Sequence, residues 1–140
     1  MLNTPLVQNY IKMIRNYATF TGRASRSEYW LAVAMNCIIV FAISIIRTVI
    51  VGVIAFSGSK AAISVTNLLL TSVQSLYSLF VIVPMYALQV RRLHDVNSSG
   101  WWLLFSGTGF GSILLLIWYC TVGTEDTNLF GSDPHPIRQY

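Results

Sequence analysis

Three long stretches without a charged residue constrain this chain more than any other feature of its sequence. They cover residues 29–46, 61–90 and 101–122 of a 140-residue chain. A bilayer core about 30 Å thick needs roughly 20 apolar residues in a helix that rises about 1.5 Å per residue. Each stretch is long enough to cross it, so the sequence predicts an all-α integral membrane protein.

The overall composition agrees with a lipid environment. Hydrophobic residues make up 54% of the chain and charged residues only 10%, whereas a soluble domain is about 25% charged. Aromatic residues reach 13%, which excludes a disordered chain, because disordered chains are poor in them. The nine Lys and Arg residues are scattered and form no basic stripe, so nucleic acid is not an expected partner.

We expect one membrane domain over residues 1–140, with three transmembrane helices at 29–49, 67–90 and 101–122. Aromatic pairs mark the ends of these segments, as is typical of residues at the membrane–water interface. No linker or repeat divides the chain. The pairs are Tyr29–Trp30, Trp101–Trp102 and Trp118–Tyr119.

The basic residues predict the orientation, because Lys and Arg accumulate on the cytoplasmic side. The leader and the loop after the second stretch carry six basic and two acidic residues, and the other side carries three of each. We therefore expect a cytoplasmic N-terminus. Three crossings would then place the tail, residues 123–140, outside.

The leader itself predicts an amphipathic helix over residues 5–20, lying in the cytoplasmic interface. Thr4 can cap it with Pro5 at its first position, a favoured pairing. Apolar side chains recur at helical spacing from Leu6, and cations lie on the opposite face. Ser25 and Glu28 then have the spacing of a capping box that opens the first span.

Three segments resemble the YhaH-like family of small bacterial inner-membrane proteins, catalogued as domain of unknown function 805. They are FTGRASRSEYW (20–30), RRLHDVNSSGWW (91–102) and GTEDTNLFGSDP (123–134). The resemblance implies a multi-span protein of the bacterial cytoplasmic membrane, and it implies no established activity. Val96 and Asn97 depart from the pattern, since a small or basic residue is usual there.

A polar cluster of Glu28, His94 and Asp95 is expected at the cytoplasmic face. Histidine titrates near neutrality, so polar chemistry is one interpretation, and a structural loop is the other. Adjacent residues on a helix point about 100° apart, and zinc needs three or four ligands, which this face offers only if Glu28 joins. We therefore predict no metal site, no cofactor and no catalytic residue.

Four arginines, Arg23, Arg26, Arg91 and Arg92, are candidates for a cationic rim. They either set the topology or bind the phosphate of anionic lipid headgroups, because guanidinium groups match phosphate oxygens. Glu28 could instead pair with Arg91 or Arg92 and tie the first span to the second. Arg47 lies 18 residues after Tyr29, about 27 Å along a helix. This favours a side chain that snorkels at the outer boundary over a functional charge inside the membrane.

The sequence favours a non-catalytic interaction or assembly component of the membrane, because membrane and interface segments occupy the chain. Membrane lipids, and either a second copy of the chain or another membrane protein, are the expected partners. An oligomeric transporter, channel or lipid-handling subunit is the alternative. A membrane enzyme that acts through His94 and Asp95 ranks last, because no nucleophile–base set accompanies them.

Overall fold

The structure, a computed structural model, describes residues 4–56 and 58–134. Within these residues it is helical and contains no sheet, only an isolated antiparallel bridge between Asn128 and Gly131. The predicted helical class is confirmed. The elements are α1 (Pro5–Arg15), α2 (Arg26–Ala55), α3 (Lys60–Asp95), the 3-10 helix η1 (Gly100–Gly107) and α4 (Gly109–Cys120).

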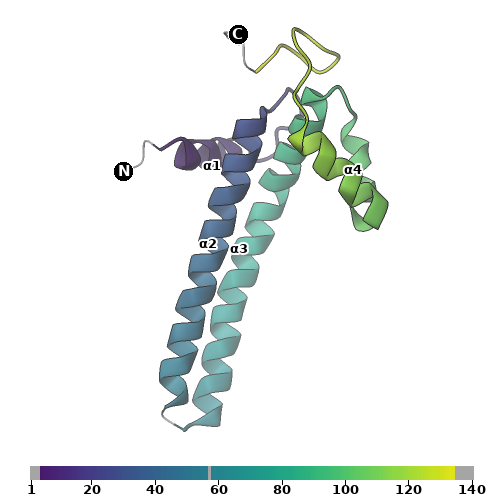
Figure 1. Cartoon of the computed structure of the whole chain (residues 1–140). Helices are drawn as coiled ribbons and strands as arrows, with labels where there is room; N and C mark the ends of the chain where they lie inside the picture. The colour runs from purple at the N-terminus through teal and green to yellow at the C-terminus, as the bar shows by residue number, and fades with distance from the viewer. Residues whose placement is uncertain (1–3, 57, 135–140) are drawn as a thin grey trace.

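Helices α2 and α3 form a long antiparallel hairpin that dominates the shape of the molecule (Figure 1). Both are long and apolar enough to cross a membrane. Large hydrophobic side chains such as Phe41, Leu68 and Leu76 are exposed along the hairpin. A continuous apolar surface of this kind is what lipid, rather than water, would cover.

Helix α1 lies across the hairpin near the end where α2 begins and α3 ends (Figure 1). Its Met13 is completely buried, and the Tyr10 hydroxyl lies 2.9 Å from that of Tyr77. The helix ends at Arg15 rather than at the predicted residue 20. At Asn16 the backbone leaves the helical region, with φ −92° and ψ 37°, and the Asn16 side-chain amide donates to the Lys12 carbonyl at 2.8 Å, which occupies a terminal acceptor of the helix.

The third apolar stretch differs from the predicted single helix over residues 101–122. It breaks at Thr108, whose extended backbone separates η1 from α4 and whose hydroxyl accepts from the Gly111 N–H at 3.1 Å. Glycines flank this threonine on both sides, and glycine is a poor helix former. Gly111 packs so closely on η1 that a Cβ there would overlap the Phe105 carbonyl. The stretch therefore folds back on itself.

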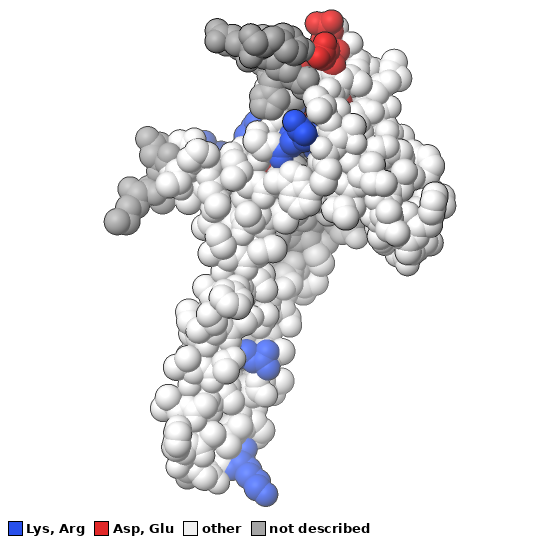
Figure 2. Space-filling model, in the orientation of Figure 1, with Lys and Arg blue, Asp and Glu red and all other residues white. Residues whose placement is uncertain are grey.

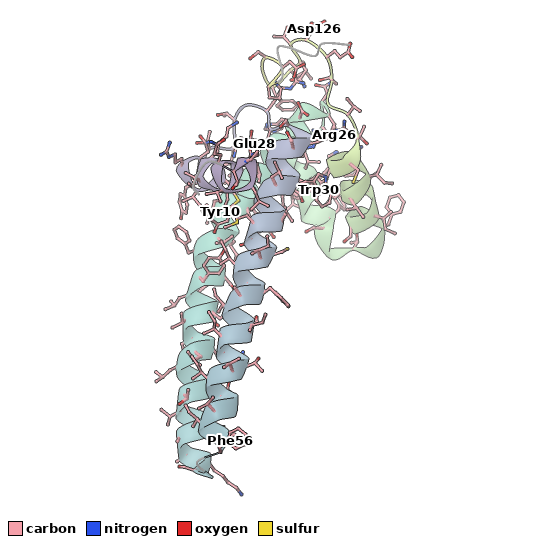
Figure 3. All side chains as sticks on the ribbon, turned by 60° about the vertical axis from the view of Figure 1, so that its left-hand side comes forward. Tyr10, Arg26, Glu28, Trp30, Phe56 and Asp126 are labelled. Carbon is pink, nitrogen blue, oxygen red and sulfur yellow. The ribbon has the colours of Figure 1, made fainter. Side chains whose placement is uncertain are left out.

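As a consequence, the tail packs at the end of the hairpin where α2 begins, not at the opposite end as expected (Figure 1). The Thr124 N–H donates to the Asp95 carbonyl at 2.9 Å, and the Asn128 amide donates to the His94 carbonyl at 2.8 Å. The far end of the hairpin is its loop near Phe56, while Asp126 lies in the tail at the other extreme (Figure 3). Residues 135–140 of the predicted tail lie outside the described residues.

Candidate functional site

Five charged side chains gather where α2 begins and α3 ends, and we call them the ion-pair cluster. None is more than 8% exposed. Charged residues are rarely buried to this degree unless they are paired, so their partners determine what the site can do. The members are Arg23, Glu28, Arg91, Arg92 and Asp95.

Asp95 lies between two guanidinium groups. Its Oδ1 accepts from Arg23 Nε at 3.0 Å, and its Oδ2 accepts from Nη1 of Arg92. Arg23 belongs to the loop before α2, whereas Arg92 and Asp95 are one turn apart at the end of α3. The carboxylate therefore joins the entrance of the hairpin to its exit.

Glu28 forms the second half of the cluster and lies beside α1 (Figure 3). Its Oε1 accepts from Arg91 Nη1 at 3.1 Å, and its Oε2 accepts from Lys12 Nζ at 2.5 Å. The sequence had suggested this tie between the two long helices through Arg91. The Ser25 hydroxyl accepts from the Glu28 N–H at 3.1 Å, so Glu28 is held at the first turn of α2 as the capping spacing predicted.

Main-chain carbonyl groups accept hydrogen bonds from the cluster and stabilise its excess positive charge. Arg92 donates to the carbonyls of Trp118, Tyr119 and Thr121, at the end of α4. These are carbonyls that a helix terminus leaves without an internal partner, and they form the negative end of its dipole. Arg23 donates to the carbonyls of Thr124 at 2.5 Å and Asp126 at 2.6 Å.

The four arginines predicted to form a lipid-binding rim are not presented together at the surface. Arg23, Arg91 and Arg92 are buried in the ion-pair cluster, and Arg26 alone of the four is exposed. Arg26 donates to the Cys120 carbonyl at 3.3 Å. Two nitrogens of Arg91, Nε and Nη2, have no hydrogen-bond partner among the described residues.

His94 and Asp95 point to different partners and form no joint site. His94 Nδ1 lies 3.1 Å from the Gly22 carbonyl, and because a carbonyl only accepts, this nitrogen carries the hydrogen. The ring stacks on Phe130 with centroids 3.9 Å apart. Within residues 4–56 and 58–134, no group of three or more His, Cys, Asp or Glu side chains could hold a metal ion.

A hollow of about 810 Å³ lies beside His94, between the end of α3, η1 and the tail. Sequence reasoning missed it, because it is formed by η1 turning back toward α3. A Cβ at Gly100 would lie 2.8 Å from Val90 Cγ1, so that glycine permits the close approach. The lining includes Val90, Trp101, Leu103, Leu104 and Phe130.

Comparisons with known proteins agree on the family. The model of a protein family described as "Protein of unknown function (DUF805)" matches residues 17–132. Inner membrane protein YhaI of Escherichia coli (strain K12) is 36% identical over 129 residues, which cover 91% of this chain and 96% of that protein. Inner membrane protein YhaH of the same strain is 33% identical over 126 residues, covering 89% and 94%. No solved structure matches the chain.

Proposed function

The chain belongs to the DUF805 family, whose relatives are inner membrane proteins, and from that premise we propose that it is a non-catalytic component of a membrane assembly. The proposal is supported by the way the two carboxylates of the ion-pair cluster are paired. Both oxygens of Glu28 and both oxygens of Asp95 already bind cationic side chains. These two carboxylates therefore hold the segments of the fold together, which supports a structural role for the cluster.

We place the protein in the inner membrane with two crossings, α2 and α3, and with η1 and α4 as a hairpin that returns to the side it entered. Its N-terminal helix α1 then lies in the interface with its cations outward. The support is the distribution of positive charge: Lys12, Arg15 and Arg26 are exposed at the end of the hairpin that holds the ion-pair cluster. The positive-inside rule puts that end, and the tail with it, in the cytoplasm.

Lipid headgroups are proposed partners of these exposed cations rather than of the buried arginines. The Lys12 side chain is 54% exposed although its amine reaches Glu28, and Arg15 is in the last turn of α1. Basic residues near an anionic membrane surface contribute about 1 kcal/mol each to binding. Lys12, Arg15 and Arg26 together form an exposed cationic surface. The predicted rim of four arginines cannot do so, because three of its members are buried.

The test of the assembly proposal is gentle extraction of the tagged chain from native membranes, with quantitative mass spectrometry of what accompanies it. We expect a complex larger than the 15.7 kDa chain, with at least one companion protein in a fixed ratio. The His94→Gln variant removes the imidazole that the enzyme interpretation requires, and it should co-purify with the same companion protein as the parent. A monodisperse chain without a companion would contradict the proposal.

Lipid handling is a second candidate, supported by the hollow of about 810 Å³ beside His94. Its aliphatic and aromatic lining suits an acyl chain, and the His94 side chain is part of that lining. Lipid retained through purification should fall when Leu104→Trp adds bulk to the lining of the hollow. The matched variant Leu68→Trp changes a similarly exposed leucine that does not line it and should leave lipid retention unchanged. Equal retention in both variants would exclude this candidate.

A further inference from the structure

Arg47 interrupts an otherwise uncharged hairpin surface. Between Trp30 and Val90 the charged residues are Arg47 and Lys60, and the surrounding surface is almost continuously uncharged (Figure 2). The apolar sequence continues through residues 48–56, where Val53 is 65% and Phe56 93% exposed. Arg47 therefore does not mark the outer limit of the apolar surface, as its spacing from Tyr29 had suggested.

The guanidinium group of Arg47 has a neutral partner. Its Nε and Nη2 donate to the Asn67 side-chain oxygen at 3.1 and 2.7 Å, and no ion pair involves it in the described part of the chain. Glu28 and Asp95 are engaged in the ion-pair cluster. The remaining acidic residues, Glu125, Asp126 and Asp133, belong to the tail at that same end (Figure 2). The charge on Arg47 is thus left without a carboxylate at its depth.

A groove with polar and apolar walls runs along α3 from this guanidinium group. It is a hollow of about 540 Å³, lined by Arg47, Leu79 and Ile82 together with four polar residues that recur at helical spacing and share one face, Thr71, Gln74, Ser75 and Ser78. The Thr71 and Ser78 hydroxyls donate to carbonyls of their own helix. The Gln74 side-chain oxygen is buried and has no hydrogen-bond partner among the described residues. The groove thus presents a cation that no carboxylate of the described residues neutralises.

We propose that this groove receives a transmembrane helix of another protein, which places an Asp or Glu side chain against Arg47. Charges inside a membrane face partners rather than lipid, and polar side chains join helices there by hydrogen bonds. A second copy is not the occupant, because its own acidic residues lie at the other end of the hairpin. In a symmetric parallel pair, the two Arg47 charges would also meet at one depth. The inference rests on the proposed assembly role and defines the chemistry of its partner.

The test uses the full chain in phosphatidylcholine vesicles and a synthetic leucine-rich transmembrane peptide without tryptophan. The peptide carries a dansyl group and one Glu at the depth of Arg47, and matched peptides carry Gln or Lys. Energy transfer from the four tryptophans of the chain reports binding. We expect the Glu peptide to bind about tenfold more tightly than the Gln peptide, and the Lys peptide to bind least.

The preference should disappear in Arg47→Gln, persist in the charge-conserving Arg47→Lys and be unaffected in Lys60→Gln. Equal binding of the Glu and Gln peptides, or a preference that survives Arg47→Gln, would overturn the proposal. Displacement of the peptide by phosphatidylglycerol would identify a lipid phosphate as the occupant, and self-association that depends on Arg47 would identify a second copy; either result also overturns it. A negative result with the peptides would not contradict a complex recovered from native membranes. The assembly proposal is therefore tested separately, by the extraction experiment.

Discussion

Arg23 and Asp95 form a buried ion pair although 72 positions separate them in the sequence, with Arg23 Nε 3.0 Å from Asp95 Oδ1. The pair joins the loop before α2 to the last residue of α3. Because Arg23 also donates to carbonyls of the tail, one side chain connects three distant segments.

The Asp95→Asn variant should lose a large part of the stability of the protein. It leaves Arg23 and Arg92 buried beside a neutral amide, and removal of one partner from a buried ion pair costs about 3–5 kcal/mol. Thermal unfolding of the detergent-solubilised chain checks this. The control is Asp126→Asn, which changes an exposed tail residue and should melt like the parent. Equal melting of both variants would show that the cluster does not stabilise the fold.

Glu28 and Arg91 should be energetically coupled. Glu28→Gln removes the carboxylate from a guanidinium that already has two unpartnered nitrogens, whereas Glu28→Gln combined with Arg91→Met also removes the buried charge. The double variant should therefore lose less stability than the sum of the two single ones, with a coupling of about 0.5–3 kcal/mol. Chemical denaturation of all four proteins measures it. As a control, Lys12→Met changes an exposed side chain and should cost about 1 kcal/mol or less. If the stability losses of Glu28→Gln and Arg91→Met simply add in the double variant, the two residues are not coupled.

Gly123→Ala should destabilise the contact between the tail and α3. A Cβ at Gly123 would overlap the Asp95 carboxylate, and forced overpacking costs about 1–3 kcal/mol. The matched change Gly52→Ala lies inside α2, where a Cβ would meet nothing within 4 Å. There the better helix propensity of alanine predicts unchanged or slightly raised stability. The melting temperatures of both variants and the parent in the same detergent test this. If Gly123→Ala melts like the parent, the tail does not pack against Asp95 as described.

The proposed two crossings predict which positions share a side of the membrane. In chains whose Cys37 and Cys120 are replaced by serine, single cysteines at Ala18, Phe56 and Leu129 occupy exposed positions. An impermeant maleimide applied to sealed vesicles of one orientation should label Ala18→Cys and Leu129→Cys from the same side. It should label Phe56→Cys from the other side, and all three after permeabilisation. Labelling of Leu129→Cys together with Phe56→Cys would restore three crossings.

The presence of two long helices could be predicted from the sequence because it depends on local properties. Length and apolar composition indicate α2 and α3, and the spacing of Ser25 and Glu28 gives the start of α2. Their extent was underestimated, because the predicted spans 29–49 and 67–90 stop short of the loop, whereas α2 continues to Ala55 and α3 begins at Lys60. The pairing of Glu28 with Arg91 follows from opposite charges at the ends of adjacent antiparallel helices. Each of these features needs only neighbouring residues or a simple hairpin.

The third apolar stretch and the lipid-binding rim could not be predicted in the same way. Residues 101–122 are as long and as free of charge as a crossing helix, and the break depends on Thr108 and two flanking glycines. The return of the chain is held by carbonyl groups that accept from Arg92. Every residue has a main-chain carbonyl, so the sequence does not indicate which carbonyls will accept from an arginine. For this reason Arg23, Arg91 and Arg92 were predicted at the surface, whereas they are buried.

The dependence of the cluster on carbonyls of the tail also fixes an order of events during synthesis. The residues of α2 and α3, with Glu28 and Asp95 among them, are synthesised before residue 96. The main-chain acceptors of Arg92 and Arg23 follow only with Trp118 to Asp126. The hydrogen bonds of these two guanidinium groups can therefore be completed only after the last part of the chain has been made.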